Sequence, residues 1–287
     1  MSEATPPATA RVMSRRRLMT AGAMVGVGVP TVGAIDGVLI TPQHLHTTDH
    51  RLASRSPRAD AMVRLLQVSD LHLHRIGRLE TRLLETLHDS LADVIVFTGD
   101  MLDRRVDLWQ LETFLRECPA GARRFAILGN WEHEAGVPRE ALERLYDGHG
   151  IELLVNRSVE FSTAGTRVRI TGLDDLRAGS PDMIAALRDA TPTPNHLLLA
   201  HCPLSRDVVT MPTDHPVDLL LAGHTHGGQV APFGLALTLP SGSGRYVAGW
   251  YRDAGPPMYV SRGIGTSLIP VRLGATPELV RFEWRLA

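Results

Sequence analysis

From residue 62 onward, hydrophobic and polar positions follow two patterns. Short runs rich in β-branched residues or leucine, typical of buried strands, alternate with segments whose apolar residues recur at helical spacing. The clearest helix is predicted over Arg78–Ala92, where a leucine stands at every fourth position from Leu79 to Leu91. Three further helices are predicted, over Val106–Glu117, Pro138–Tyr146 and Met183–Ala190.

Ten segments have the pattern of strands. They lie at Val63–Val68, Asp93–Phe97, Arg124–Leu128, Ile151–Val155, Val159–Ser162, Val168–Thr171, His196–Ala200, Asp218–Ala222, Met258–Ser261 and Leu279–Trp284. Strands and helices alternate in the first half, and strands crowd together in the second. This order predicts a layered α/β fold. A chain of 287 residues is long enough for one large domain.

The first 40 residues have a different pattern. Residues 14–19, Ser-Arg-Arg-Arg-Leu-Met, resemble a twin-arginine export signal. An uncharged stretch rich in Gly, Ala and Val follows over 21–35 and continues past Asp36 to Ile40. We expect residues 1–40 to be a signal or a membrane anchor, recognised by the twin-arginine export machinery. The protein would then work outside the cytoplasm, in the periplasm or attached to a membrane.

Residues 41–60 are polar and contain two prolines and three histidines, which is typical of a linker. The mature domain is therefore expected to span residues 61–287. Its composition is that of a globular protein, with 44% hydrophobic and 21% charged residues in the whole chain. The net charge of −1 gives no strong signal for nucleic-acid binding. All 30 basic residues are arginine, which excludes mechanisms that need a catalytic lysine.

Five predicted strands end in a side chain that can ligate a metal. In open α/β folds, ligands bind just outside the carboxyl ends of strands. Two of these ends carry pairs spaced two residues apart, which would face the same way in an extended segment. The seven candidate metal ligands are Asp70, His72, Asp100, Asn130, His201, His224 and His226.

Seven donors exceed the needs of one ordinary ion. They match two divalent cations that share a bridging carboxylate, roughly 3.5–4 Å apart. Mixed nitrogen and oxygen donors favour Mn, Fe, Zn or Co over Ca or Mg alone. Each strand end taken alone is a common turn or surface pattern; the combination of all five, in this order, is what predicts a dinuclear metal centre.

The order Asp-x-His, Gly-Asp-x-x-Asp, Gly-Asn, His and Gly-His-x-His resembles the calcineurin-like metallophosphoesterase family, and the Gly-His-x-His form resembles its phosphodiesterase-type branches. Looser segments at residues 172–175, 244–249 and 261–267 resemble a bacterial exported or membrane-associated branch. The resemblance runs from about Val63 to the C-terminus. It implies a four-layer αββα sandwich with a dimetal site at the sheet edges. It also implies that a hydroxide bridging the two metals is the nucleophile.

The resemblance further implies a division of the ligands. Asp70, His72 and His226 would hold one metal, Asn130, His201 and His224 the other, and Asp100 would bridge them. The family usually has a histidine directly after the Asn, oriented by the second Asp of the preceding motif, which is Asp103 here. This chain has Trp131 in that place, and tryptophan cannot transfer a proton. His133 is the candidate to replace it, and His74 is a further candidate.

The sequence thus predicts a metal-dependent phosphoester hydrolase that acts on a diester or a pyrophosphate-like bond. The export signal points to a small-molecule or lipid-linked substrate of the cell envelope, and to membrane association. Two alternatives stay open. Trp131 is compatible with a non-catalytic metal-binding envelope protein, and a nuclease would need a basic groove that the overall charge does not indicate.

Overall fold

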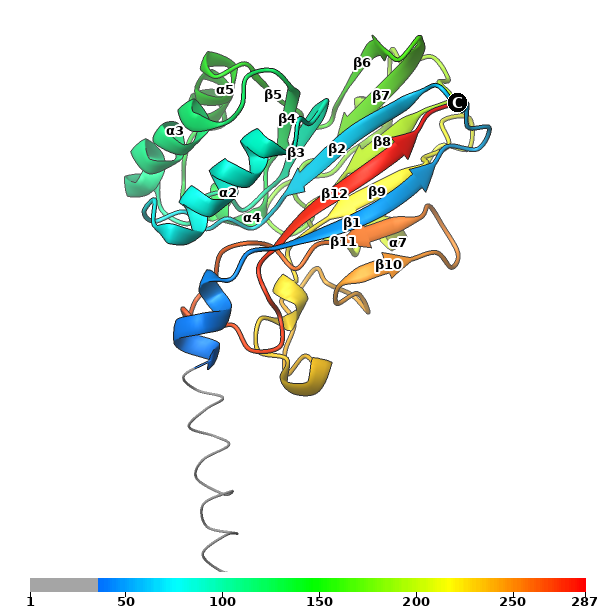
Figure 1. Cartoon of the computed structure of the whole chain (residues 1–287). Coiled ribbons are helices and arrows are strands. Elements are labelled where there is room, and N and C mark those ends of the chain that lie inside the picture. Colours follow the sequence, from blue (N-terminus) through cyan, green and yellow to red (C-terminus); the bar gives the residue numbers. More distant parts are fainter. Residues whose placement is uncertain (1–35) are drawn as a thin grey trace, which may run out of the picture.

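The computed structural model describes residues 36–287, and these build two six-stranded sheets stacked face to face (Figure 1). The first sheet, in spatial order, contains β1 (His46–Ala53), β12 (Glu278–Arg285), β2 (Met62–Val68), β3 (Val94–Thr98), β4 (Arg123–Ile127) and β5 (Ile151–Leu153). The second contains β10 (Gly249–Tyr251), β11 (Met258–Val260), β9 (Leu219–Ala222), β8 (His196–Leu199), β7 (Thr166–Gly172) and β6 (Arg157–Thr163).

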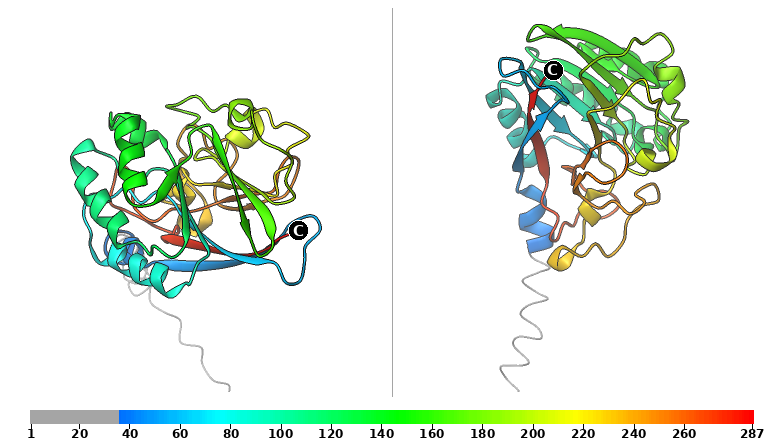
Figure 2. Two further views of the ribbon diagram at one scale, coloured as in Figure 1. Left: turned by 90° about the horizontal axis from the view of Figure 1, so that it is seen from above. Right: turned by 90° about the vertical axis from the view of Figure 1, so that its right-hand side faces the viewer.

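Helices cover the outer face of each sheet, unequally. The first sheet carries α2 (Arg78–Asp89), α3 (Leu108–Glu117) and α5 (Arg139–Gly148), while α4 (Asn130–Glu134) follows β4 directly. The second sheet carries only the short helices α6 (Met183–Ala186) and α7 (Ser205–Val208). Five one-turn helices complete the described residues: η1 (Asp36–Ile40), η2 (Thr41–Gln43), η3 (Arg105–Asp107), η4 (His226–Gly228) and η5 (Pro232–Gly234). The predicted αββα sandwich is confirmed, with a thin outer layer on the second sheet (Figure 2).

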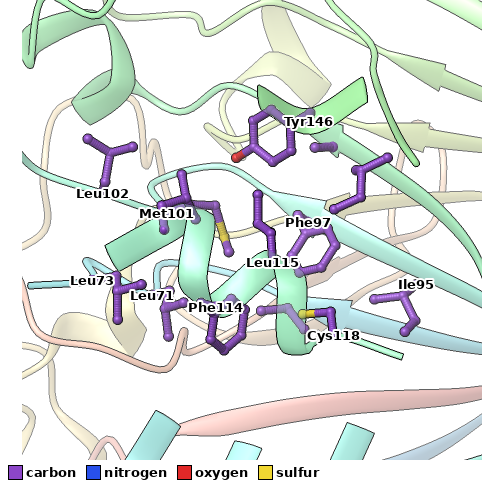
Figure 3. Packing of buried hydrophobic residues seen from close by; sticks show 14 of the residues in the cluster. Leu71, Leu73, Ile95, Phe97, Met101, Leu102, Phe114, Leu115, Cys118 and Tyr146 are labelled. Atoms are coloured by element: carbon purple, nitrogen blue, oxygen red, sulfur yellow. The ribbon is translucent and has the colours of Figure 1, made fainter. Parts of the chain in front are cut away.

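The central strands are buried on both faces, which explains their unbroken apolar sequences. All five residues of β3 are buried. One face packs between the sheets, where Val96 and Phe125 meet Leu199 and Leu221. The other face packs under the helices, where Phe97, Phe114, Met101 and Tyr146 belong to one cluster (Figure 3). This double burial holds the strand ends in fixed positions.

The ten predicted strands and the first three predicted helices are confirmed, with ends that differ by no more than three residues. The fourth helix is shorter than predicted, because α6 ends at Ala186 rather than Ala190. The linker prediction for residues 41–60 is wrong over His46–Ala53, which form β1 and pair in parallel with β12 along their whole length. The strand at Gly249–Tyr251 was not predicted.

The predicted signal or anchor lies almost entirely outside the described residues, which begin at Asp36. Within residues 36–287, no helix has the length and apolar character needed to cross a bilayer.

Candidate metal centre

The carboxyl ends of five parallel strands meet at one edge of the sandwich. Strands β2, β3 and β4 of the first sheet run parallel to one another, as do β8 and β9 of the second. All seven candidate ligands follow these strands within two to four residues. Asp70 and His72 follow β2, Asp100 follows β3, Asn130 follows β4, His201 follows β8, and His224 and His226 follow β9.

The first group of donors consists of Asp70, His72 and His226. Their ligating atoms lie within 4.8 Å of one another, and all three residues are buried. The Nε2 atoms of His72 and His226 are 2.9 Å apart, and His226 Nε2 lies 3.6 Å from Asp70 Oδ1. Three buried donor atoms this close together are the arrangement expected for a metal ligand set.

The second group consists of Asp100, His201 and His224, with the same close spacing and burial. His201 Nε2 lies 3.0 Å from Asp100 Oδ2 and 3.2 Å from His224 Nδ1. The same Asp100 oxygen lies 3.8 Å from His72 Nε2 in the first group. Asp100 therefore stands between the two groups, where a carboxylate could serve two ions at once.

Hydrogen bonds behind the rings fix which nitrogen faces the centre. A carbonyl oxygen can only accept, so His201 Nδ1 donates to Thr98 O (2.8 Å) and His224 Nε2 donates to Ser241 O (2.8 Å). His72 Nδ1 is bonded to the Asp103 carboxylate. In each neutral ring the opposite nitrogen then carries the lone pair toward the centre, which is how metal-binding histidines are held.

Asn130 provides a direct test of whether these residues fit a cation. Its side chain is buried, its Nδ2 donates to Glu134 (3.1 Å), and its Oδ1 has no hydrogen-bond partner. A buried polar atom without a partner is costly and calls for an explanation such as an ion. The orphaned oxygen and the mixed N/O donor set both fit divalent cations of the Mn, Fe, Zn or Co type.

The backbone at this edge is left-handed rather than extended, contrary to the expectation from the i, i+2 spacing. Asp70, His72 and Asp100 have φ values of 52°, 47° and 54°, and His224 and His226 have φ values of 71° and 51°. Such values are uncommon for non-glycine residues and cluster at functional sites. The paired side chains converge because a left-handed residue at each ligand position turns the chain, rather than through strand alternation.

Close contacts between these turns require glycine at two positions. Gly99 has a φ of 88°, and a Cβ there would lie 2.5 Å from Gly129 N. A Cβ on Gly223 would collide with Ser69 Oγ and Asp70 Oδ2. Both collisions are with buried groups at the centre, so these glycines set how closely the strand ends approach.

Burial and neighbouring charges shift the pKa values of the ionisable groups of the centre, in different directions for different groups. Burial alone would raise the pKa of Asp100, but the charge and hydrogen bond of His201 outweigh it and hold this pKa at about 2. Burial would lower the pKa of His201, but Asp100 raises it well above the ordinary value. Burial and the neighbouring His201 lower the pKa of His224 to about 4. Burial and His72 lower the pKa of His226, so both rings of the Gly-His-x-His segment favour the neutral form that binds metals.

Glu132 links two turns of the site, and the sequence analysis did not identify it as a site residue. It is fully buried and accepts backbone N–H groups from Asp100 (3.0 Å), Met101 (2.6 Å) and Gly129 (2.9 Å). Burial and the nearby Asp100 raise its pKa to about 7. Its carboxylate ties the turn after β3 to the turn after β4; the Gly-x-x-Glu spacing of a capped helix start was the available signal.

Arg272 is a second residue that the sequence did not reveal. It is fully buried, and its Nη2 lies 3.1 Å from His226 Nδ1. It also donates to the carbonyls of Gly265, Arg262 and Ala275. Arg272 therefore holds the 262–275 loop against the back of His226.

The predicted proton donor, His133, and the residue predicted to orient it, Asp103, lie in separate networks. His133 Nε2 lies 2.9 Å from Asp174 Oδ1, and this hydrogen bond raises the pKa of His133. Asp103 instead contacts His72 and, at 3.2 Å, His74 Nε2. Among the described residues no hydrogen bond joins Asp103 to His133.

Two open cavities lie beside the centre. One, of about 520 Å³, is lined by His72, His74, Arg75 and Arg78 among others, and the second, of about 460 Å³, by Asp103, Arg104, Trp131 and Leu268. Both include His74 and Thr266 in their walls. The first cavity reaches His72 of the first donor group, and both cavities have arginine side chains in their walls.

Comparison with known proteins agrees with this geometry. A family model described as calcineurin-like phosphoesterase matches residues 63–228. The chain is 34% identical over 284 residues to the uncharacterized metallophosphoesterase YkuE of Bacillus subtilis, covering 94% of this chain and 97% of that protein. It is 32% identical over 246 residues to the phosphodiesterase YaeI of Escherichia coli, covering 82% of this chain and 86% of that protein.

Among solved structures, a dimetal phosphatase from Danio rerio aligns with a TM-score of 0.47 and 17% identity, covering 74% of this chain and 90% of the other. The family model spans more than half of the chain, and every candidate ligand lies within the matched range. The chain therefore belongs to the calcineurin-like phosphoesterase family.

Proposed function

We propose that this protein is a metal-dependent phosphodiesterase. The observation that carries the proposal is the pair of buried donor groups joined by Asp100. Family membership supports phosphoester hydrolysis, and the relative from Escherichia coli is named a phosphodiesterase. The arginines in the cavity walls would attract the negative charge of a phosphoester.

In this proposal each group would hold one divalent cation, with Asp100 placed between the two groups to serve both. Asp70, His72 and His226 form the first ligand set, and Asn130, His201 and His224 complete the second. Two cations held there would supply Lewis-acid chemistry, neutralising charge on the phosphoryl group and lowering the pKa of water toward neutrality. Asp103 positions His72 by holding its Nδ1 proton.

His133 is proposed to donate the proton to the leaving group. The Asp174 carboxylate raises its pKa, so the imidazolium persists to higher pH than in an ordinary histidine. Its side chain is 27% exposed, so it can be reached from solvent. The indole of Trp131 is too weak an acid to transfer its proton, and its ring instead packs edge-on to His72 with 6.1 Å between ring centroids.

The central test is Asp100→Asn, assayed with a chromogenic phosphodiester and by metal analysis. We expect hydrolysis to fall by at least about a hundredfold, and bound metal to fall below two ions per chain, because the amide cannot neutralise two cations. Asp60→Asn, on an exposed residue, is the control and should behave as wild type. Unchanged hydrolysis in Asp100→Asn would rule out the bridging role. Two bound ions without hydrolysis of any mono- or diester in the wild type would support the non-catalytic alternative.

A leaving-group series tests His133. In the variant His133→Gln, hydrolysis of a diester with a poor alkoxide leaving group should fall by roughly 10²–10⁴-fold, the usual contribution of general acid catalysis. A p-nitrophenyl diester needs little protonation and should be hydrolysed at a nearly unchanged rate. Equal losses on both substrates would show that His133 has no role in proton transfer.

We further propose that the twin-arginine segment exports the protein, so that the substrate lies in the cell envelope. The residues concerned, Arg15 and Arg16, precede the described part of the chain. Replacing both with lysine should leave the protein in the cytoplasmic fraction, while the same change at Arg55 and Arg58 should not. Export of the doubly substituted signal variant would contradict this route.

A further inference from the structure

Exposed apolar side chains gather at the end of the molecule that carries the metal centre. Thirteen large hydrophobic residues are exposed among the described residues, and seven of them fall in three short segments. They are Val38 and Ile40, then Phe233, Leu235 and Leu237, then Leu268 and Ile269. Phe233 is fully exposed and Leu268 is 87% exposed. Single exposed apolar residues are ordinary on a protein surface, but a concentration of this kind marks an interaction site.

Hydrogen bonds join the three segments into one surface. Arg272 N donates to Gly37 O (2.8 Å), Ala231 N donates to Leu273 O (2.7 Å), and Gln229 Nε2 donates to Ile269 O (3.0 Å). Figures 1 and 2 show the corresponding blue, gold and orange-red segments together at the end of the molecule opposite the C-terminus. We name this surface, made of residues 36–40, 229–237 and 267–273, the apolar end.

We propose that the apolar end docks onto the surface of a lipid bilayer, with the metal centre facing the lipid. Its apolar side chains would enter the boundary between headgroups and acyl chains, as those of interfacial membrane proteins do. The placement of the preceding sequence supports a bilayer as the occupant. Residues 21–35 are uncharged and apolar, and they lead directly into η1, which is itself part of the apolar end.

Charge beside the apolar end supports the same partner. Arg75, Arg78 and Arg104 are exposed and line the two cavities, and the cavity that contains Arg104 also contains Leu268 and Ile269. Basic residues next to an apolar membrane-contacting surface attract anionic lipid headgroups. Long arginine side chains can also reach headgroups while the neighbouring leucines are buried.

This orientation has a consequence for the substrate, which rests on the proposed function. The wall of the cavity beside Asp103 and Trp131 continues into Leu268 and Ile269, so a docked molecule would open this cavity at the headgroup level. The fitting substrate class is therefore a phosphodiester within a lipid headgroup. Docking itself requires no hydrolysis and can be measured separately.

The experiment places an environment-sensitive NBD fluorophore on single cysteines of the full-length protein. Leu268→Cys reports on the apolar end, and Ile184→Cys, 66% exposed on α6, is the matched control. The native Cys118 and Cys202 are buried, with relative exposures of 4% and 0%, and will not react in the folded protein. The labelled proteins are mixed with vesicles of phosphatidylethanolamine and phosphatidylglycerol, and emission and quenching by aqueous iodide are recorded.

We expect the label at 268 to shift its emission to the blue and to become protected from iodide when vesicles are added, while the label at 184 does neither. Vesicle binding that leaves the label at 268 open to iodide would show attachment through the N-terminal segment alone and would overturn the proposal. A concentration-dependent blue shift at 268 without vesicles would assign the surface to a second copy of the chain, which also overturns it. Failure of docking leaves hydrolysis of soluble diesters intact, so the two proposals fail separately.

Discussion

Replacing Gly223 with alanine tests whether the metal centre depends on the closeness of two strand ends. Gly223 lies between β9 and His224, and a Cβ at this position would overlap Ser69 Oγ and Asp70 Oδ2 and approach Ser69 Cβ to 3.2 Å. Ser69 and Asp70 are fully buried, so neither can move into solvent. The added methyl must push the Asp70 carboxylate away from β9.

The expected loss in the free energy of unfolding follows from the packing and the hydrogen bonds that this displacement disturbs. Overfilling a packed interior costs about 1–3 kcal/mol. Asp70 Oδ1 accepts the His224 N–H at 2.8 Å and Oδ2 accepts the Ser69 O–H at 2.5 Å. Losing one such hydrogen bond to a carboxylate costs about 1.5–3 kcal/mol. Alanine also lowers the conformational entropy of the unfolded chain, which stabilises the folded protein by about 0.4–1 kcal/mol. Gly223→Ala should therefore lower the free energy of unfolding by roughly 1.5–5.5 kcal/mol.

Urea unfolding followed by tryptophan fluorescence measures this loss, and elemental analysis measures the metal that the variant retains. We expect metal affinity to fall by about 10–100-fold, as it does when support for a ligand is disturbed. Gly121→Ala is the matched control because a Cβ there meets nothing within 4 Å; its stability should stay within about 1 kcal/mol of wild type. If the two alanine variants were equally stable and equally metal-loaded, the reasoning from close approach would be refuted.

Three further predictions follow from the contacts of the site. Asp103→Asn should weaken metal binding by about 10–100-fold, measured by competition with a chelator, because the amide holds His72 less firmly. Metal binding should release protons and tighten as pH rises, measured by calorimetry in buffers of different ionisation enthalpy, because His201 has a raised pKa and must lose a proton to ligate. The stability contributed by the His133–Asp174 pair should be complete below pH about 6.5 as long as Asp174 is ionised, and should disappear as pH rises through the raised pKa of His133. Thermal melts across this range should show that dependence in the wild type but not in His133→Gln.

The layered fold could be predicted because its central strands are buried on both faces. Segments such as Val94–Thr98 contain no polar residue that faces solvent, so their apolar runs identify them directly. The edge strand β1 could not be found in this way. Its residues alternate between exposed and half-buried, and its sequence, His-Thr-Thr-Asp-His-Arg-Leu-Ala, resembles a linker. Only its pairing with β12, more than 200 residues later in the chain, makes it a strand.

The seven candidate ligands could be predicted from the sequence because each follows an apolar run that ends at the same edge. The local geometry could not, since spacing alone suggested extended pairs and the backbone at Asp70 and His72 is left-handed. The groups that form hydrogen bonds with the outer side of the histidine ligands could not be predicted either. Asp103 binds His72, and Ser241 O fixes His224, through contacts between segments far apart in the chain. Sequence spacing carries no information about such contacts.

Trp131 shows why loss of the usual histidine need not abolish the metal centre. The backbone N–H and the side chain of Trp131 have separate roles. The Trp131 N–H still donates to Asp100 Oδ1 at 2.9 Å, and this bond helps to keep the pKa of Asp100 low. Any residue but proline supplies that N–H, so substitution at 131 leaves the Asp100 carboxylate in place. What changes is the side chain, whose ring now packs against His72 and lines a cavity wall. The metal-binding and proton-donating parts of the site are thus physically separable, and a defect in hydrolysis traced to Trp131 should appear with poor leaving groups and leave metal binding unchanged.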